Sequence, residues 1–249
     1  MTSPLLLPDW PAPAGVRALC STRLGGVSRP PWDSFNLGDH VGDDPAAVAA
    51  NRAAWARHLG ARPVFLNQVH GTHTVRLDAA TADGTVADAC VADTPGVACT
   101  IMVADCLPVL LCDTRGTRVG AAHAGWRGLA GQGGTGVIES LAAAFDPAHT
   151  LAWLGPCIGP RAFEVGPEVK AAFESVDAAA GTLFACQGHG KWLADLPGLA
   201  RRRLAALGIT RIHGNDGSDG WCTVTAASRF FSHRRDRVSG RLAASVWLA

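Results

Sequence analysis

The sequence predicts an α+β protein in which helices flank a core of mixed β-sheet, with a three-layer α/β/α arrangement as the alternative. Three observations lead to this prediction. Apolar runs of strand length follow one another between residues 63 and 122 without an intervening helix, which disfavours strict strand–helix–strand winding. Segments with helical periodicity lie before and after this region. Neither a repeat nor a linker is found, so residues 1–249 are predicted to form a single catalytic domain.

The N-terminal part predicts a lead-in, a strand, a loop and a helix. Residues 1–14 are rich in proline, and residues 16–22 (VRALCST) have the composition of a strand. A long loop with glycine and proline follows. Asp44 can cap a helix whose first turn contains Pro45, and Gly60 is suited to its end.

The rest of the chain predicts further strands and three helices, separated by turn residues such as Asp83-Gly84 and Pro95-Gly96. The expected strands are 63–68, 72–78, 85–93, 97–103, 107–113, 118–124, 150–155, 228–233 and 241–248. The expected helices are 137–145, 167–175 and 197–208.

Composition excludes several classes of protein. With a net charge of +1, nothing points to a nucleic-acid partner. The most apolar run, 97–112, is interrupted by Asp105 and Pro108 and is shorter than the ~20 residues of a membrane span, and the N-terminus lacks the basic start of a secretory signal. Eight cysteines without a C-x-x-C pair are typical of free thiols in a reducing compartment. We therefore expect a cytoplasmic protein without a membrane or nucleic-acid partner.

Three segments carry metal-competent side chains at the edges of apolar strands: NQVHG with His70, VADCLPV with Cys106 and GAAHAGWRG with His123. Because they are far apart in the chain, they would meet only in the fold, as catalytic ligands do. Two imidazoles and a thiolate suit zinc and leave a fourth position open, which is the catalytic pattern.

Other interpretations of the same residues remain open. Cys106 could be a nucleophile with His70 or His123 as its base and Asp105 as the orienting group. Asp105 could also transfer protons as an acid or base. The three residues could form a non-catalytic metal-binding module, or be a buried cysteine and two structural histidines.

The loop TRLGGVS is a candidate phosphate site. Arg23, the amides of Gly25 and Gly26, and Ser28 could surround an anion, although a plain β-turn explains the same pattern. Arg127 is a second candidate for an anionic substrate, with a surface ion pair as its alternative. Further polar candidates are Asn36, Asn67 and His73.

With these segments assembled, the chain resembles the YfiH-like family, also called the laccase-domain or multicopper polyphenol oxidase family, which includes peptidoglycan editing factors and purine nucleoside phosphorylases. The matching motifs run nearly end to end: TRLGGVS, SFNLG, NQVHG, ADCLPVLL, AAHAGWRG, LGPCIGP, FEVGPEV and RFFSHRRDRVSGRLAASVWL. Two positions depart from the family pattern: His233 replaces the usual tyrosine of the tail, and Cys157 lies at a variable position.

The resemblance implies that His70, Cys106 and His123 hold zinc. It also implies phosphorolysis of adenosine, inosine, guanosine or methylthioadenosine, and deamination of adenosine, so that the partners are a purine nucleoside and phosphate. Alternatives are a polyphenol oxidase and a cysteine-type hydrolase that edits peptidoglycan precursors. Multicopper oxidation is disfavoured because the nine histidines form no H-x-H motif, although copper could occupy the same three ligands. The sequence does not indicate an oligomeric state.

Overall fold

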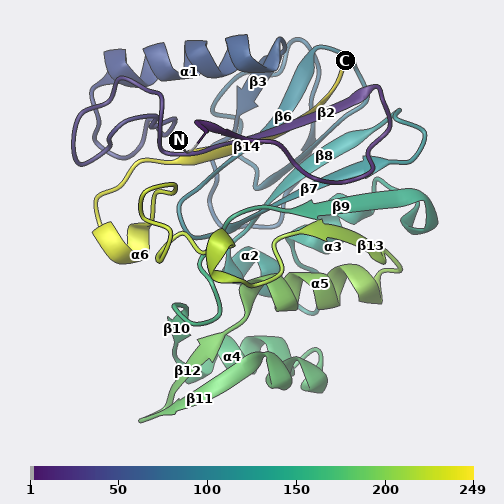
Figure 1. The fold of residues 1–249 in the computed structure, drawn as a ribbon. Helices are drawn as coiled ribbons and strands as arrows, with labels where there is room; N and C mark the ends of the chain where they lie inside the picture. Colours follow the sequence, from purple (N-terminus) through teal and green to yellow (C-terminus); the bar gives the residue numbers. More distant parts are fainter. Residues whose placement is uncertain (1–2) are drawn as a thin grey trace.

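The computed structural model describes residues 3–249, so Met1 and Thr2 of the predicted lead-in lie outside the described residues. Its strands form three sheets (Figure 1). The five-stranded sheet has the order β1 (Leu5–Leu6), β2 (Val16–Ser21), β14 (Leu242–Leu248), β6 (Val97–Val103), β3 (Arg62–Phe65). The six-stranded sheet has the order β13 (Arg211–Gly214), β9 (Thr150–Leu154), β7 (Leu107–Asp113), β8 (Val119–Ala124), β5 (Ala89–Ala92), β4 (Thr74–Arg76). The small sheet has the order β10 (Glu164–Val165), β12 (Lys191–Ala194), β11 (Phe184–Gly188).

The two large sheets pack face to face. Ile101 of β6 and Val246 of β14 meet Leu110 of β7 and Val119 of β8 in one buried cluster between them. Both sheets are mixed, because β3–β6, β4–β5 and β9–β13 are parallel pairs among antiparallel ones.

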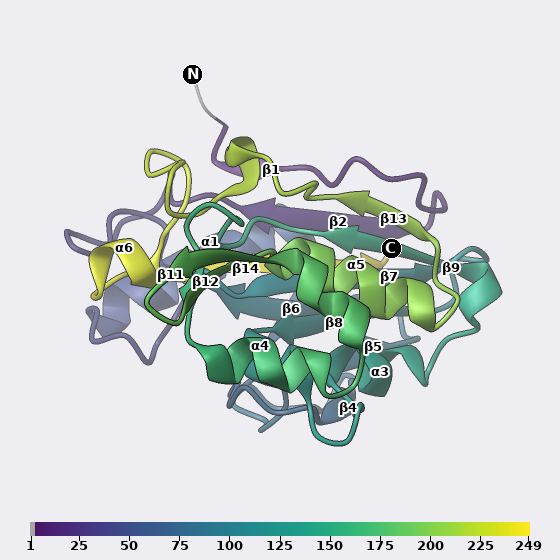
Figure 2. The same ribbon diagram turned by 90° about the horizontal axis from the view of Figure 1, so that it is seen from below.

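Helices cover the outer faces of the two sheets. On the five-stranded sheet, α1 (Pro45–Leu59) buries Trp55. On the six-stranded sheet, α3 (Val137–Ala142) and α5 (Leu196–Ala206) share a second buried cluster with β7 and β8. Figure 2 shows α4 (Pro167–Glu174), α3 and α5 in front of this sheet. The remaining helical segments are α2 (Trp126–Ala130), α6 (His233–Asp236), η1 (Pro147–His149), η2 (Ala178–Leu183) and η3 (Asp219–Trp221).

The predicted α+β class with a mixed sheet core is confirmed, but the layers number four, α/β/β/α, so the three-layer alternative is wrong. The strands between residues 63 and 122 divide between two sheets. The expected helix after Asp44 is also confirmed: the Asp44 carboxylate accepts a hydrogen bond from the Ala46 amide, Pro45 opens the helix, and Gly60 ends it with a φ of 63°. Apolar runs of strand length showed where most strands lie, but not which sheet each one joins.

The predicted strand 228–233 is wrong. Phe230 and Phe231 are fully buried between the sheets, which explains their apolar pattern. The Phe230 amide, however, donates to Ala226 within a turn, and Ser232 caps α6 by accepting from the Arg235 amide. The small sheet of β10, β11 and β12 and the strand β13 were not predicted.

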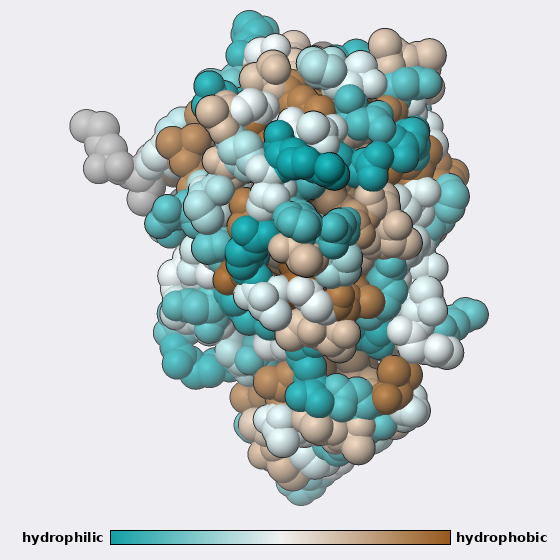
Figure 3. All heavy atoms as spheres, turned by 90° about the vertical axis from the view of Figure 1, so that its right-hand side faces the viewer, coloured by the Kyte–Doolittle hydropathy of each residue, from teal (hydrophilic) through white to brown (hydrophobic). Residues whose placement is uncertain are grey.

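Among the described residues, no helix has both the length and the apolar character needed to span a membrane. Figure 3 shows one face of the molecule, on which hydrophobic residues lie scattered among hydrophilic ones.

Candidate functional site

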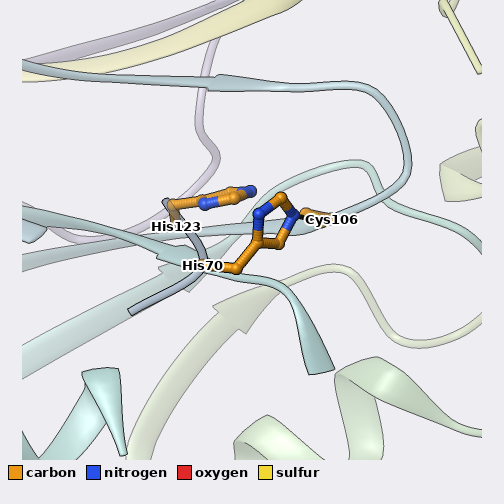
Figure 4. Close-up of side chains that lie close together, drawn as sticks. All are labelled: His70, Cys106 and His123. Carbon is orange, nitrogen blue, oxygen red and sulfur yellow. Dashed lines mark hydrogen bonds between the residues drawn. The ribbon is translucent and has the colours of Figure 1, made fainter. Parts of the chain in front are cut away.

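His70, Cys106 and His123 meet at one end of the two packed sheets (Figure 4). One ligand atom from each lies within 4.8 Å of the other two. The Cys106 Sγ is 3.7 Å from the His70 Nε2, and the two imidazole centroids are 4.7 Å apart. The sequence prediction that these three distant residues converge is therefore confirmed.

Each ligand comes from a different part of the fold. His123 is a buried residue of β8, and its neighbour in the β7–β8 ladder is Pro108. Cys106 lies in the turn between β6 and β7, where the chain crosses from one large sheet to the other. His70 is exposed in the loop between β3 and β4 and has a φ of 60°. A non-glycine residue adopts this backbone conformation at a cost of about 1–3 kcal/mol, so the surrounding contacts must hold it.

Asp88 supplies those contacts, and the sequence reasoning missed it. Its carboxylate is fully buried and accepts hydrogen bonds from the amides of Val69, His70 and Gly71, at 3.1, 2.9 and 2.7 Å. It also accepts from the His123 Nδ1 at 2.8 Å. The available signal was an aspartate inside the apolar run VADACVAD, a position that requires polar partners once buried.

Two glycines let the backbone approach the ligands closely. A Cβ at Gly125 would lie 2.9 Å from the Cys106 Sγ and 2.9 Å from the His70 Cδ2. A Cβ at Gly128 would lie 2.7 Å from the carbonyl oxygen of Gly71. The glycines of the motif HAGWRG therefore make room for the site.

Asp105 holds the turn that carries Cys106. Its Oδ1 accepts from the Thr223 hydroxyl at 2.6 Å, and its Oδ2 accepts from the Arg234 amide at 2.6 Å. Its backbone carbonyl accepts from the Ile158 amide at 2.9 Å. Asp105 also lines the cavity next to the ligands, but both carboxylate oxygens are engaged in fixing this turn.

Charges within the site favour a thiolate. Burial of the sulfur raises the pKa of the Cys106 thiol, but the charge and hydrogen bonds of His123 and His70 lower it to about 6. Conversely, burial lowers the pKa of His123, but the Cys106 thiolate and the Asp88 carboxylate raise it to about 9. Burial also raises the pKa of Asp88, and its bonds to His123 and to the Gly71 amide bring it below the usual value. The Cys106 thiolate and the His123 imidazolium therefore stabilise each other.

The donor set fits a tetrahedral metal ion such as zinc. Zn–S and Zn–N distances of about 2.3 and 2.0 Å place a sulfur and a nitrogen ligand about 3.5 Å apart, close to the 3.7 Å between Cys106 Sγ and His70 Nε2. The bond from His123 Nδ1 to Asp88 leaves Nε2 available as a ligand atom. Three protein ligands leave one coordination position open.

A cavity of about 420 Å³ opens beside the three ligands. The apolar residues of the lining include Met102, Trp126, Ile158 and Phe163. The basic residues of the lining, besides the two ligand histidines, are His40, His233, Arg234, Arg237 and Arg241. Asp105 is the one acidic side chain of the lining, so the cavity is suited to an anion combined with a flat apolar group.

No residue of the TRLGGVS loop lines this cavity, and the polar side chains of Thr22, Arg23 and Ser28 are already bonded. The Arg23 guanidinium donates to the backbone carbonyls of Asp33 and Ala227 and pairs with the Asp33 carboxylate at 3.2 Å. The Gly26 amide donates to the Ser34 hydroxyl, and a Cβ at Gly26 would lie 2.2 Å from the carbonyl oxygen of Ser34. The backbone of Ser34 leaves no room for a side chain at position 26, and this alone explains the glycine there.

Four further candidates from the sequence also lie outside the cavity lining. Ser28 donates to the Asp43 carboxylate at 2.6 Å, and Asn36 donates to the same carboxylate at 2.9 Å. Both are buried and tie the loop to itself. Gly25 is exposed in the same loop, with a φ of 92°. Arg127 is exposed and stacks over the Trp126 ring at 4.5 Å, so its stacking partner, and not Arg127 itself, lines the cavity.

Comparisons with known proteins extend over nearly the whole chain. The model of a family described as "Multi-copper polyphenol oxidoreductase laccase" matches residues 17–249. The chain is 50% identical to the Escherichia coli protein named purine nucleoside phosphorylase YfiH, over 99% of each chain. It is 52% identical to a Pseudomonas aeruginosa purine nucleoside phosphorylase, over 98% of each chain. A crystal structure of a Neisseria meningitidis protein, 48% identical, matches with a TM-score of 0.93 over 99% of each chain.

Proposed function

We propose that the chain is a zinc-dependent purine nucleoside phosphorylase that also deaminates adenosine. It belongs to the multi-copper polyphenol oxidoreductase laccase family, and the relatives it matches are named purine nucleoside phosphorylases. One observation carries the proposal. A Cys-His₂ cluster lines a cavity that combines three arginines with apolar side chains. Such a cavity can hold a flat base and an anion side by side.

The apolar part of the lining is the proposed site for the purine ring. Trp126, Phe163 and Met102 offer flat or adaptable apolar surface, which suits an aromatic base. The arginines are the proposed site for phosphate. No hydrogen bond or ion pair of the Arg237 guanidinium is found within residues 3–249, whereas Arg241 donates to the carbonyls of Ser239 and Gly240. A guanidinium can bind two phosphate oxygens at once.

Phosphorolysis breaks the bond from C1′ of the ribose to N9 of the purine and forms a bond from C1′ to a phosphate oxygen. The arginines would hold phosphate against C1′ and would balance its charge while the ribose passes through an oxocarbenium-like state. The departing base requires a proton. His40 and His233 are the two imidazoles of the lining outside the metal cluster. Because burial and the charge of Arg241 lower the pKa of His40, His233 is the proposed source of that proton. Asp105 is not proposed for this step, because its carboxylate oxygens hold the Cys106 turn.

A bound zinc ion would supply a Lewis acid at the His70–Cys106–His123 end of the cavity. Around it, the chain's own residues set the geometry: Asp88 orients His123, and Asp105 fixes the Cys106 turn. Deamination of adenosine at the same end of the cavity would replace the C6 amino group by an oxygen from water, with release of ammonia.

The test measures phosphate-dependent release of the free base from inosine and adenosine, and ammonia from adenosine, together with zinc content. We expect His70→Ala and Cys106→Ala to abolish both activities and to remove the zinc. Full turnover by a metal-free variant would overturn the proposal.

A second experiment separates the metal site from a cysteine hydrolase. The lowered pKa of Cys106 is a feature that a nucleophilic thiol would share. We expect excess zinc to protect Cys106 from iodoacetamide, because a coordinated sulfur is unavailable for alkylation. Alkylation of Cys106 at the same rate with and without zinc would favour the hydrolase.

A further inference from the structure

Asp88 is connected to two of the three proposed ligands at once. A single oxygen atom, Oδ1, accepts from the His70 backbone amide at 2.9 Å and from the His123 Nδ1 at 2.8 Å. The second oxygen, Oδ2, accepts from the amides of Val69 and Gly71. One carboxylate therefore links a loop between β3 and β4 to the strand β8.

The backbone of Asp88 is fixed as firmly as its side chain. Its amide donates to the carbonyl of His73 at 3.1 Å, and its carbonyl accepts from the His123 amide at 2.7 Å. The residue immediately precedes β5, which pairs with β8. The carboxylate thus has a set position relative to His123, and the turn around His70 is built onto it.

We propose that Asp88 is the positioning residue of the metal centre: it fixes the ring orientation of His123 and the turn of His70 so that both imidazoles face one ion. The inference rests on the proposed metal function. In this role Asp88 acts through the two histidines and does not contact substrate. The hydrogen bond from His123 Nδ1 to Asp88 directs His123 Nε2 to the metal. Three hydrogen bonds from backbone amides to the Asp88 carboxylate hold the unfavourable backbone conformation of His70.

The variant that tests this is Asp88→Asn. An asparagine keeps one acceptor oxygen, but its NH₂ group is a donor. It would face backbone amides that are also donors and that bond to a carboxylate oxygen in the wild-type protein. Outer partners of metal ligands typically change metal affinity by about 10–100-fold. We expect a loss of zinc and cobalt affinity in this range, together with a changed cobalt absorption spectrum, since the imidazole geometry around the ion would relax.

Asp113→Asn is the matched control. Asp113 is also buried and holds a turn, accepting from the amides of Thr117 and Arg118 at 2.7 and 3.3 Å. It is not among the residues that line the cavity. We expect this variant to lose stability but to keep wild-type metal affinity and the wild-type cobalt spectrum.

A measurement on the wild-type protein covers the case in which Asp88→Asn does not fold. With cadmium-113 in the site and nitrogen-15 in the histidines, we expect coupling from the metal to Nε2 of His123 and a proton retained on Nδ1. Coupling to Nδ1 would overturn the inference, as would unchanged metal affinity in Asp88→Asn. Metal binding without any phosphorolysis would instead overturn the proposed function and leave the role of Asp88 standing.

Discussion

A single methyl group at Gly125 should disable the metal centre. Gly125 has φ −67° and ψ 157°, a conformation open to alanine, so Gly125→Ala adds no backbone strain. The new Cβ would lie 2.9 Å from both the Cys106 Sγ and the His70 Cδ2. Non-bonded heavy atoms prefer about 3.5–4.0 Å, so these two side chains must each move by at least about 0.6 Å.

That displacement exceeds what a metal site tolerates. Metal–ligand distances vary by about 0.2 Å around their preferred values, so both displaced ligands would fall outside this range. We expect at least about a 100-fold loss of zinc affinity, equivalent to about 2.7 kcal/mol. Activity should fall with zinc content, whereas extra bulk in a packed region should lower the free energy of unfolding by only about 1–3 kcal/mol.

Competition with a calibrated chelator measures the affinity, and urea unfolding checks that the variant is folded. The control is Gly15→Ala, because a Cβ at Gly15 would have no atom within 4 Å. Wild-type zinc affinity in a folded Gly125→Ala protein would refute the claim that Cys106 and His70 hold the same ion.

Further expectations concern the cavity, the N-terminal loop and pH. Arg237→Ala should raise the KM for phosphate about tenfold or more while the KM for nucleoside changes little, as measured by initial rates. Ser28→Ala should leave the KM for phosphate unchanged, because the Ser28 hydroxyl is bonded to Asp43 and Asn51. An equal rise in this KM in both variants would contradict the assignment. Asn51→Ala should lower the free energy of unfolding in urea by about 2–4 kcal/mol, since it removes the hydrogen bonds that Asn51 makes with the Val27 amide and with the carbonyls of Ser34 and Asn36. Zinc affinity should fall about tenfold per pH unit as pH drops from 9 to 7, because His123, with a pKa raised to about 9, must release its proton to bind, and calorimetry in two buffers measures that proton. An affinity independent of pH over this range would contradict the ion pair.

Local chemistry made part of this structure predictable. The helix after Asp44 follows from a cap, a first-turn proline and a terminal glycine, all of which act within one element. The cluster of His70, Cys106 and His123 was predicted from metal-competent side chains at strand edges together with the resemblance to the YfiH-like family, because residue type and spacing alone do not distinguish these three from structural residues. The division of the strands between two sheets was not predictable in this way, because it depends on which strands pair.

The TRLGGVS loop and Asp88 show two limits of sequence patterns: the loop looks like a ligand site, whereas Asp88 does not look like part of one. The glycines of TRLGGVS look the same whether backbone or ligand fills the space beside them, and at Gly26 the backbone of Ser34 fills it. Asp88 looks like one polar residue in a strand until β5 pairs with β8 and the His70 turn folds over it. Both limits have one cause, since the partner that gives each residue its role is remote in sequence.

The number of metal sites bears on the oxidoreductase name of the family. Among residues 3–249, the three ligands form the one cluster of histidine, cysteine and acidic side chains whose ligand atoms converge, so a single ion is expected. Zinc has no redox chemistry, whereas copper would bind the same imidazoles and thiolate. We therefore expect the zinc-loaded protein to carry out phosphorolysis without oxidising catechol, and a copper-loaded preparation to oxidise it slowly. Oxygen uptake with catechol, measured after loading with each metal, checks this. Fast oxidation by the zinc form would mean that the activity resides elsewhere than at His70, Cys106 and His123.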